Sequence, residues 1–240
     1  MKKIFGLMLM LGLSMNTTAV MADDDDDDNK ECPVGLVSGQ TIDQEFGVGI
    51  NAITRCVENR KKIKVVMQVN QACRDTSIVD GALRNHADKC GTSRGYGIAQ
   101  MRNMILDWVV THGIPVDKLD LNIIVHGPGA TMLLKNPTDP VTGEETARTN
   151  NLEEKVEELI GGNVPRAEGA NVKFHFCMNT VRGMAKKAAI AKFGATATAE
   201  QIGMMKKGIV KKVIPGVTYV TGGLTALADF EKEGYMYIQP

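Results

Sequence analysis

The chain has 240 residues, of which 43% are apolar and only 5% aromatic, and its 28 Lys and Arg balance 28 Asp and Glu. This length suits one domain of moderate size with extensions, and it is enough to bury a real core. The balanced charge argues against a general nucleic-acid binder, which would carry a basic excess.

The first 22 residues have the pattern of a secretory signal peptide. Lys2 and Lys3 supply the positive charge, residues 4–15 form an apolar stretch, and small residues end at Ala22, where we expect cleavage. The apolar stretch is too short to span a bilayer, and no later segment has a long uncharged apolar run. We therefore expect a periplasmic or secreted protein with no membrane partner.

Residues 23–62 are predicted to be an acidic tail followed by an N-terminal extension. Positions 23–28 are all aspartate, and such a block repels itself and favours a solvated tail. The run lacks the glycine and the distal glutamate of a calcium loop, so it predicts no metal site.

Five cysteines in an exported chain predict two disulfides and one unpaired thiol. Cys73 and Cys90 flank one loop insertion, and a bridge between them would contribute ~3 kcal/mol on the chain-entropy model. Cys32 and Cys56 both lie in the N-terminal extension and would tie it down. Cys177 is then left over, although the sequence leaves cross-pairing among the other four cysteines open.

From residue 63 onward, predicted strands alternate with predicted helices. Strands are expected at 63–69, 121–125, 172–176, 217–220 and 235–238. Helical segments are expected at 98 to about 112, 131–135 (a short turn), 151–160 with Asn151 as its cap, 181–212 with a break around Gly194, and 224–232. This alternation predicts the α/β class, a three-layer sandwich around a central, mostly parallel five-stranded sheet. The domain would span 63–240, with insertions at about 71–96 and 181–212.

Polar or reactive residues follow three of the predicted strands. Asn70 follows the first strand, residues 126–129 (His-Gly-Pro-Gly) follow the second, and Cys177 follows the third. Because open α/β sheets bind ligands at the carboxyl ends of their strands, these segments form the candidate site. The glycine-containing segment lacks the residues of a phosphate loop or dinucleotide fingerprint, so no cofactor is predicted.

Cys177 is the sharpest of these features. It lies where a strand gives way to a helix, and helix-end N–H groups directed at its sulfur would favour the thiolate. The alternative is an inert, buried core cysteine. His126 would stabilise the thiolate or donate a proton, or else only shape the loop that follows it. His175 shares the strand face of Cys177 and is interpreted as a satisfied core histidine.

At these same residues the chain resembles the DsrE/DsrF-like family of small sulfur-relay proteins, especially its exported branch. The matching segments are 64–70, 122–129, 172–180, 215–217 and 233–240. The resemblance implies an α/β sandwich assembled as a homo-oligomer, commonly a trimer or hexamer, and a persulfide carried at the position of Cys177. The insertions and the secretory route depart from the cytoplasmic members of the family.

Two hypotheses of function follow from these observations. In the first, the protein is a periplasmic sulfur carrier that exchanges sulfur with the thiol of a donor or acceptor protein, and turnover as an enzyme is left open. Its site would comprise Cys177 and His126 as catalytic residues, with five further residues lining or shaping the pocket: Asn70, Gly127, Gly129, Asn179 and Thr180. In the second, the protein is a non-catalytic oligomeric module that binds a small ligand or a protein. A metal-handling role is a weaker third option, because no ordered ligand spacing supports it.

Overall fold

The computed structural model describes residues 62–72, 95, 97–138, 142, 147 and 149–239. The predicted leader and the acidic run lie outside these residues. So do most of the predicted insertion at 71–96 and the four cysteines assigned to disulfides, Cys32, Cys56, Cys73 and Cys90.

One five-stranded sheet organises the domain, and all its neighbouring strands are parallel. The strand order is β4-β3-β2-β1-β5. The strands are β1 (Ile63–Val69), β2 (Leu119–Val125), β3 (Val172–Cys177), β4 (Thr218–Val220) and β5 (Met236–Ile238). The predicted fold class is therefore confirmed, and the sheet is wholly rather than mostly parallel.

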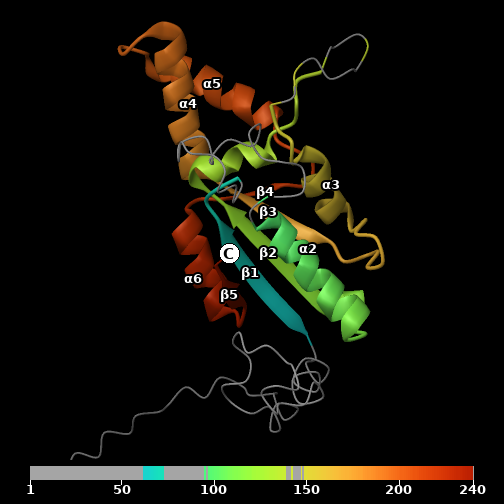
Figure 1. Cartoon of the computed structure of the whole chain (residues 1–240). Helices are drawn as coiled ribbons and strands as arrows, with labels where there is room; N and C mark the ends of the chain where they lie inside the picture. Colours follow the sequence, from blue (N-terminus) through green and yellow to red (C-terminus); the bar gives the residue numbers. More distant parts are fainter. Residues whose placement is uncertain are drawn as a thin grey trace, which may run out of the picture.

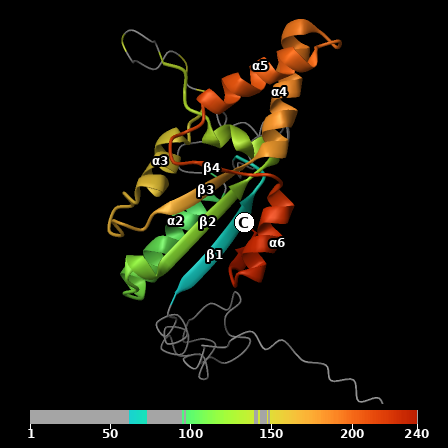
Figure 2. The same cartoon turned by 180° about the vertical axis from the view of Figure 1, so that it is seen from behind.

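Helices cover both faces of the sheet, which gives the three predicted layers (Figures 1 and 2). On one face, α2 (Ile98–Leu106) and α3 (Glu153–Gly161) pack over the larger apolar core. On the other face, α6 (Gly223–Lys232) packs over Val66 and Ile124 in a smaller cluster. Val66 and Ile124 make the α6 side of β1 and β2 apolar in part, whereas in β3 Lys173 and His175 alternate with the apolar residues of the larger core.

A helical hairpin extends from the sandwich beyond the carboxyl ends of the strands (Figure 1). It consists of α4 (Met178–Phe193) and α5 (Ala199–Lys211), separated at Gly194, which has a φ of 90°. Thr198 and Gln201 form a capping box that begins α5. The predicted helical stretch with its break is confirmed, and α4 begins earlier than expected, directly after β3.

Short helical segments complete the connections between the strands. α2 continues as a π-helical turn (Asp107–Thr111), and single 3₁₀ segments occupy Val116–Lys118 and Gly127–Leu133. The predicted turn at 131–135 thus begins earlier, at the first glycine after β2. No described helix is both long and apolar enough to cross a membrane.

The start of α3 differs from the prediction. Leu152, rather than Asn151, is the N-cap residue, and its backbone N–H donates to Oδ1 of Asn150 at 2.9 Å. Nδ2 of Asn150 donates to the carbonyls of Met132 and Leu134 at 2.8 and 2.7 Å. The buried Asn150 side chain therefore fixes the chain just ahead of the helix, which moves the cap along by one residue.

Candidate functional site

Cys177 is a free thiol at the carboxyl end of β3 and is the N-cap residue of α4. Its neighbours along β3 alternate between faces, so Phe176 points into the larger core while the thiol faces the α6 side. Only 4% of the Cys177 surface is exposed. The strand-to-helix setting expected from the sequence is present.

Hydrogen-bond donors from two helices converge on the Cys177 sulfur. The backbone N–H groups of Asn179 and Thr180 come from the first turn of α4, and the N–H of Gly223 comes from the first residue of α6. Burial alone would raise the pKa of the thiol. The donors, which include the Thr180 hydroxyl, outweigh burial and bring the pKa below its ordinary value.

Thr180 joins the thiol to the loop after β2. Its hydroxyl oxygen accepts a hydrogen bond of 2.9 Å from the backbone N–H of Gly127, which has a φ of 59°. The same hydroxyl bonds to Cys177, and with its acceptor side engaged by Gly127 its proton is free for the sulfur. Three residues that the sequence predicted for the site, Thr180, Asn179 and Gly127, are thus brought together around the thiol.

Gly129 and Asn70 are linked through their backbones. The N–H of Gly129 donates to the carbonyl of Asn70 at 3.0 Å. A Cβ on residue 129 would lie 2.7 Å from the backbone nitrogen of Gln71, so only glycine permits this close approach. Both residues therefore shape the loop beside the site, and the Asn70 residue itself is exposed.

His126 lies beside Cys177 at the same edge of the sheet. β2 pairs with β3 in parallel, the last residues in register are Val125 and Phe176, and His126 and Cys177 each come one residue later. A Cβ on Gly223 would meet the His126 ring at 3.4 Å, so the imidazole packs against the start of α6. The structure therefore gathers His126, Gly223 and Cys177 at one place.

The imidazole nitrogen of His126 is directed to Gln68 on β1. The Nε2 atoms of the two residues are 2.5 Å apart, and Oε1 of Gln68 accepts a bond of 2.5 Å from the Tyr237 hydroxyl. Gln68 therefore donates to an unprotonated imidazole nitrogen. Burial lowers the pKa of His126 and favours that neutral form. The structure shows that Gln68 positions the His126 imidazole. The catalytic role of His126 stays a prediction.

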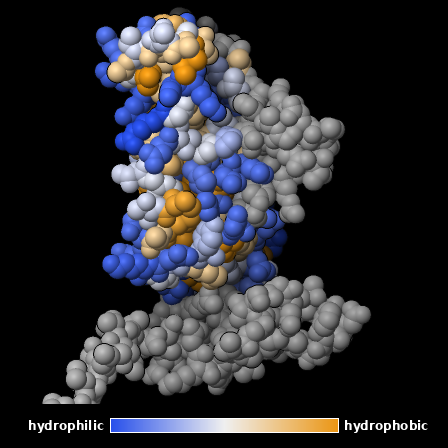
Figure 3. All heavy atoms as spheres, turned by 90° about the vertical axis from the view of Figure 1, so that its left-hand side faces the viewer, coloured by the Kyte–Doolittle hydropathy of each residue, from blue (hydrophilic) through white to orange (hydrophobic). Residues whose placement is uncertain are grey.

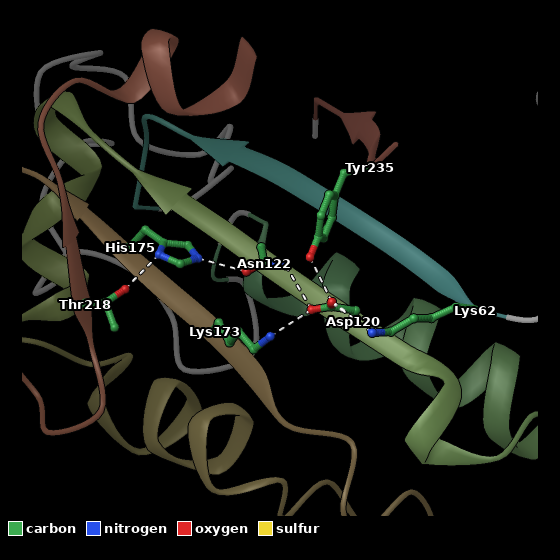
Figure 4. A network of polar contacts seen from close by, with 7 residues as sticks. All are labelled: Lys62, Asp120, Asn122, Lys173, His175, Thr218 and Tyr235. Atoms are coloured by element: carbon green, nitrogen blue, oxygen red, sulfur yellow. Dashed lines mark hydrogen bonds and ion pairs between the residues drawn. The ribbon is translucent and has the colours of Figure 1, made fainter. Parts of the chain in front are cut away.

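A second polar cluster lies further down the α6 side of the sheet, with Asp120 at its centre (Figure 4). The Asp120 carboxylate accepts from Lys173 at 2.9 Å and from the Tyr235 hydroxyl at 2.8 Å, and Lys62 lies 3.4 Å away. Burial would raise the pKa of Asp120, but these partners lower it to about 2. Burial and Asp120 together raise the pKa of Tyr235 to about 12.

His175 belongs to the same cluster. Its Nε2 is 2.8 Å from Oδ1 of Asn122, and its Nδ1 is 2.7 Å from the Thr218 hydroxyl. Burial, with the Lys173 charge adding to it, lowers the pKa of His175 to about 4. The interpretation of His175 as a satisfied histidine is confirmed, because both ring nitrogens are bonded within the protein.

The sequence analysis missed this cluster, although a signal for it was present. Asp120 and Asn122 alternate with apolar residues in β2, as Lys173 and His175 do in β3, and such alternation marks a polar strand face. With its carboxylate and imidazole already partnered, the cluster organises the sheet face. Among the described residues, no group of three or more His, Cys, Asp or Glu is placed to hold a metal ion.

A separate cavity lies between α2 and α3, on the other side of the sheet. It has a volume of about 310 Å³ and includes Arg102 and Lys155 in its wall. Both side chains pair with the Glu158 carboxylate, at 3.1 and 3.0 Å, so each cation already has a partner within the protein. The described residues that line the cavity include no cysteine, serine or threonine, so the thiol is the more distinctive site chemically.

Comparisons with known proteins leave the chemistry of the site open. No family model and no curated protein matches the chain. Among solved structures, it is similar to a protein of unknown function, MTH1491 from Methanobacterium thermoautotrophicum, with 17% identity and a TM-score of 0.39 over 75% of this chain and 100% of that chain. A likeness of this size carries no argument about the site.

Proposed function

We propose that this protein is an exported sulfur carrier that holds a persulfide on Cys177 and passes the outer sulfur to a partner thiol. The observation that carries the proposal is the convergence of N–H donors from the starts of α4 and α6 on one free thiol. A thiolate stabilised in this way is the form that attacks sulfane sulfur. The resemblance of the strand ends to sulfur-relay proteins agrees with this chemistry.

The proposed cycle has two exchange steps and no net redox change. The Cys177 thiolate attacks the outer sulfur of a donor persulfide, the donor's sulfur–sulfur bond breaks, and the donor leaves as a thiolate. A thiolate on the acceptor then attacks the outer sulfur on Cys177. That attack forms the acceptor persulfide and returns Cys177 to its thiolate.

The residues around the thiol have separate roles in this cycle. The Thr180 hydroxyl and the N–H of Gly223 hold negative charge on the sulfur of Cys177. His126, held by Gln68, would accept or return the proton of an incoming thiol. The proposal includes the exported location, which the pattern of the first 22 residues predicts. It also includes assembly into a homo-oligomer, which the family resemblance implies.

The test is intact mass and alkylation of the full, non-reduced protein. We expect one rapidly modified thiol, located at Cys177 by peptide mapping, and a mass increase of one sulfur atom at that residue after treatment with a persulfide donor. The Cys177→Ser protein is the control and should lose both signals. Equal sulfur transfer by Cys177→Ser and wild type would end the proposal.

A second candidate function is a non-catalytic binding module, which the low exposure of Cys177 favours. With 4% of its surface accessible, the thiol is nearly covered. This alternative predicts slow alkylation of Cys177 in the native protein, normal alkylation in denaturant, and no bound sulfur. The same experiment therefore separates the two functions.

A further inference from the structure

The α4–α5 hairpin is strongly basic. Residues 178–212 contain eight Lys or Arg and a single acidic residue, Glu200. The basic residues are Arg182, Lys186, Lys187, Lys192, Lys206, Lys207, Lys211 and Lys212. A surface with this excess of one sign attracts oppositely charged molecules and orients their approach.

Apolar side chains are interspersed with these charges on the outer faces of the hairpin. Met204 is 50% exposed and lies one helical turn from Lys207, and Ile190 is also exposed and lies one turn from Lys186. At the top of Figure 3, where the hairpin faces the viewer, apolar and hydrophilic residues alternate across the surface. Such a mixture resembles a protein-binding surface more than a purely solvated helix face.

This surface is continuous with the thiol site. α4 begins immediately after Cys177, so Arg182 and Lys186 lie about 8 and about 14 Å from it along the helix axis. On the other side, Leu224 is 73% exposed and follows Gly223, whose N–H bonds the sulfur. Exposed Tyr219 lies on the opposite face of the sheet, where its ring stacks on Phe176, so it is not part of this surface. The thiol thus lies between the basic hairpin and the exposed apolar side chain of Leu224.

We propose that the partner thiol of Cys177 belongs to an acidic protein that docks along the α4–α5 hairpin and covers the exposed side chain of Leu224. This inference rests on the proposed function and adds the chemistry of the partner. The lysines would steer the encounter, and Leu224 would supply apolar contact area beside the exchanging sulfurs. An anionic lipid would satisfy the lysines but bring no thiol, and a second copy would bring the same positive charge.

The test uses three synthetic cysteine peptides of equal length, flanked by aspartate, lysine or serine. Each is activated as a mixed disulfide with thionitrobenzoate, which is released when the Cys177 thiolate attacks the peptide sulfur and forms a protein–peptide disulfide. With the full chain at low salt, we expect the acidic peptide to react about tenfold faster than the lysine peptide, and the preference to shrink at high salt. Cys177→Ser reports the background.

Two charge-reversal variants locate the preference. Lys186→Glu with Lys207→Glu should abolish it, because both lysines lie on the exposed faces of the hairpin. Lys118→Glu with Lys232→Glu is the control and makes the same change in net charge. Lys118 precedes the start of β2 and Lys232 ends α6, so both lie away from the thiol, and this variant should retain the preference. An equal effect of both pairs would show a net-charge effect and overturn docking on the hairpin.

The remaining outcomes separate this inference from the proposed function. Equal rates for all three peptides would overturn the acidic partner and leave a reactive Cys177 in place. Failure of even the serine peptide to react would overturn both. A cysteine-free acidic peptide can also be tested for binding to the Cys177→Ser protein. Binding only after deletion of residues 23–28 would show that the chain's own aspartates occupy the hairpin, and would overturn docking of an acidic partner there. Binding to phosphatidylglycerol vesicles but not to the acidic peptide would assign it to lipid.

Discussion

The two faces of the sheet differ in role: one carries the larger apolar core and the other carries the polar and reactive side chains. The alternating residues of β3 show this difference within a single strand. Phe174 and Phe176 point toward α2 and α3 and are completely buried in the larger core. Lys173, His175 and Cys177 alternate with them and point to the opposite side of the sheet. There α6 packs on the sheet only through the smaller apolar cluster. On that side each polar group needs a partner, and the last residue of the strand is a thiol bonded to helix ends. The difference predicts distinct responses to substitution.

The largest effect is expected on the apolar face. Phe174→Ala would remove a fully buried ring between the strands and helices and lower the free energy of unfolding by about 3–5 kcal/mol. Urea denaturation followed by circular dichroism measures this. A loss below about 1 kcal/mol would show that this side of the sheet is not the main core.

The polar face should instead respond to acid through His175. Its folded pKa of about 4 lies below the ordinary 6.5, so the unfolded chain binds more protons between these values. Stability from this group is therefore complete above pH 6.5 and is lost as the pH falls to 4, by about 2 kcal/mol given its partial burial.

His175→Gln should flatten this part of the stability profile, measured by thermal unfolding across the same pH range. His126 has its pKa shifted in the same direction, so a residual slope is expected. An unchanged slope in His175→Gln would place the acid sensitivity elsewhere.

Asp120 should act at lower pH than His175. Its pKa falls from 3.8 to about 2 on folding, so its stabilisation is present above pH 3.8 and disappears as the pH falls toward 2. Asp120→Asn should cost about 1–2 kcal/mol at neutral pH, a figure reduced by the exposure of both lysine partners. The penalty should shrink at pH 2 in matched denaturation curves, and a constant penalty would contradict this account.

A smaller effect on stability, but a specific one on chemistry, is expected at Thr180. Thr180→Val removes the hydroxyl that bonds the Cys177 sulfur and should raise the thiol pKa, with a loss of stability of about 1 kcal/mol. The pH profile of the alkylation rate reports the pKa. Thr180→Ser keeps the hydroxyl and should resemble wild type, so a shift of the same size in both variants would contradict the role of this group.

The smallest change should come from Leu224, near the start of α6. Leu224→Ala removes a side chain that is mostly in solvent and should change the free energy of unfolding by less than about 0.5 kcal/mol. The same denaturation assay measures this effect. A loss comparable to that of Phe174→Ala would mean that Leu224 is covered in the folded protein.

Periodicity predicted the fold well because the strands are short runs of apolar residues with clear polar ends. The free thiol at a strand end could also be placed, since Cys177 stands directly after the buried Phe176 and before a helical segment. The Gly223 donor could not be foreseen. It begins a helix 46 residues later in the chain, and only the strand order brings it to the sulfur.

The bonding of His126 was equally hidden from sequence reasoning. Its partner Gln68 lies on β1 and is bonded in turn by Tyr237 from β5, so three strands decide what the imidazole does. The prediction of Asn151 as the cap of α3 was wrong for a related reason. The Asn150 side chain is bonded to carbonyl groups in the segment after β2, which local sequence cannot show. Local patterns identify elements, whereas side-chain partners depend on which strands become neighbours.

The placement of β5 next to β1 also bears on how the chain folds. Met236–Ile238 pairs with Val65–Met67, so the first described strand finds one of its neighbours only far along the chain, in a segment that is synthesised much later. Until then β1 offers unpaired N–H and C=O groups on that edge, which can recruit strands of other chains. Pairing across such a sequence separation is slow to form. Loss of β5 should therefore produce aggregation during synthesis more readily than unfolding of the folded domain.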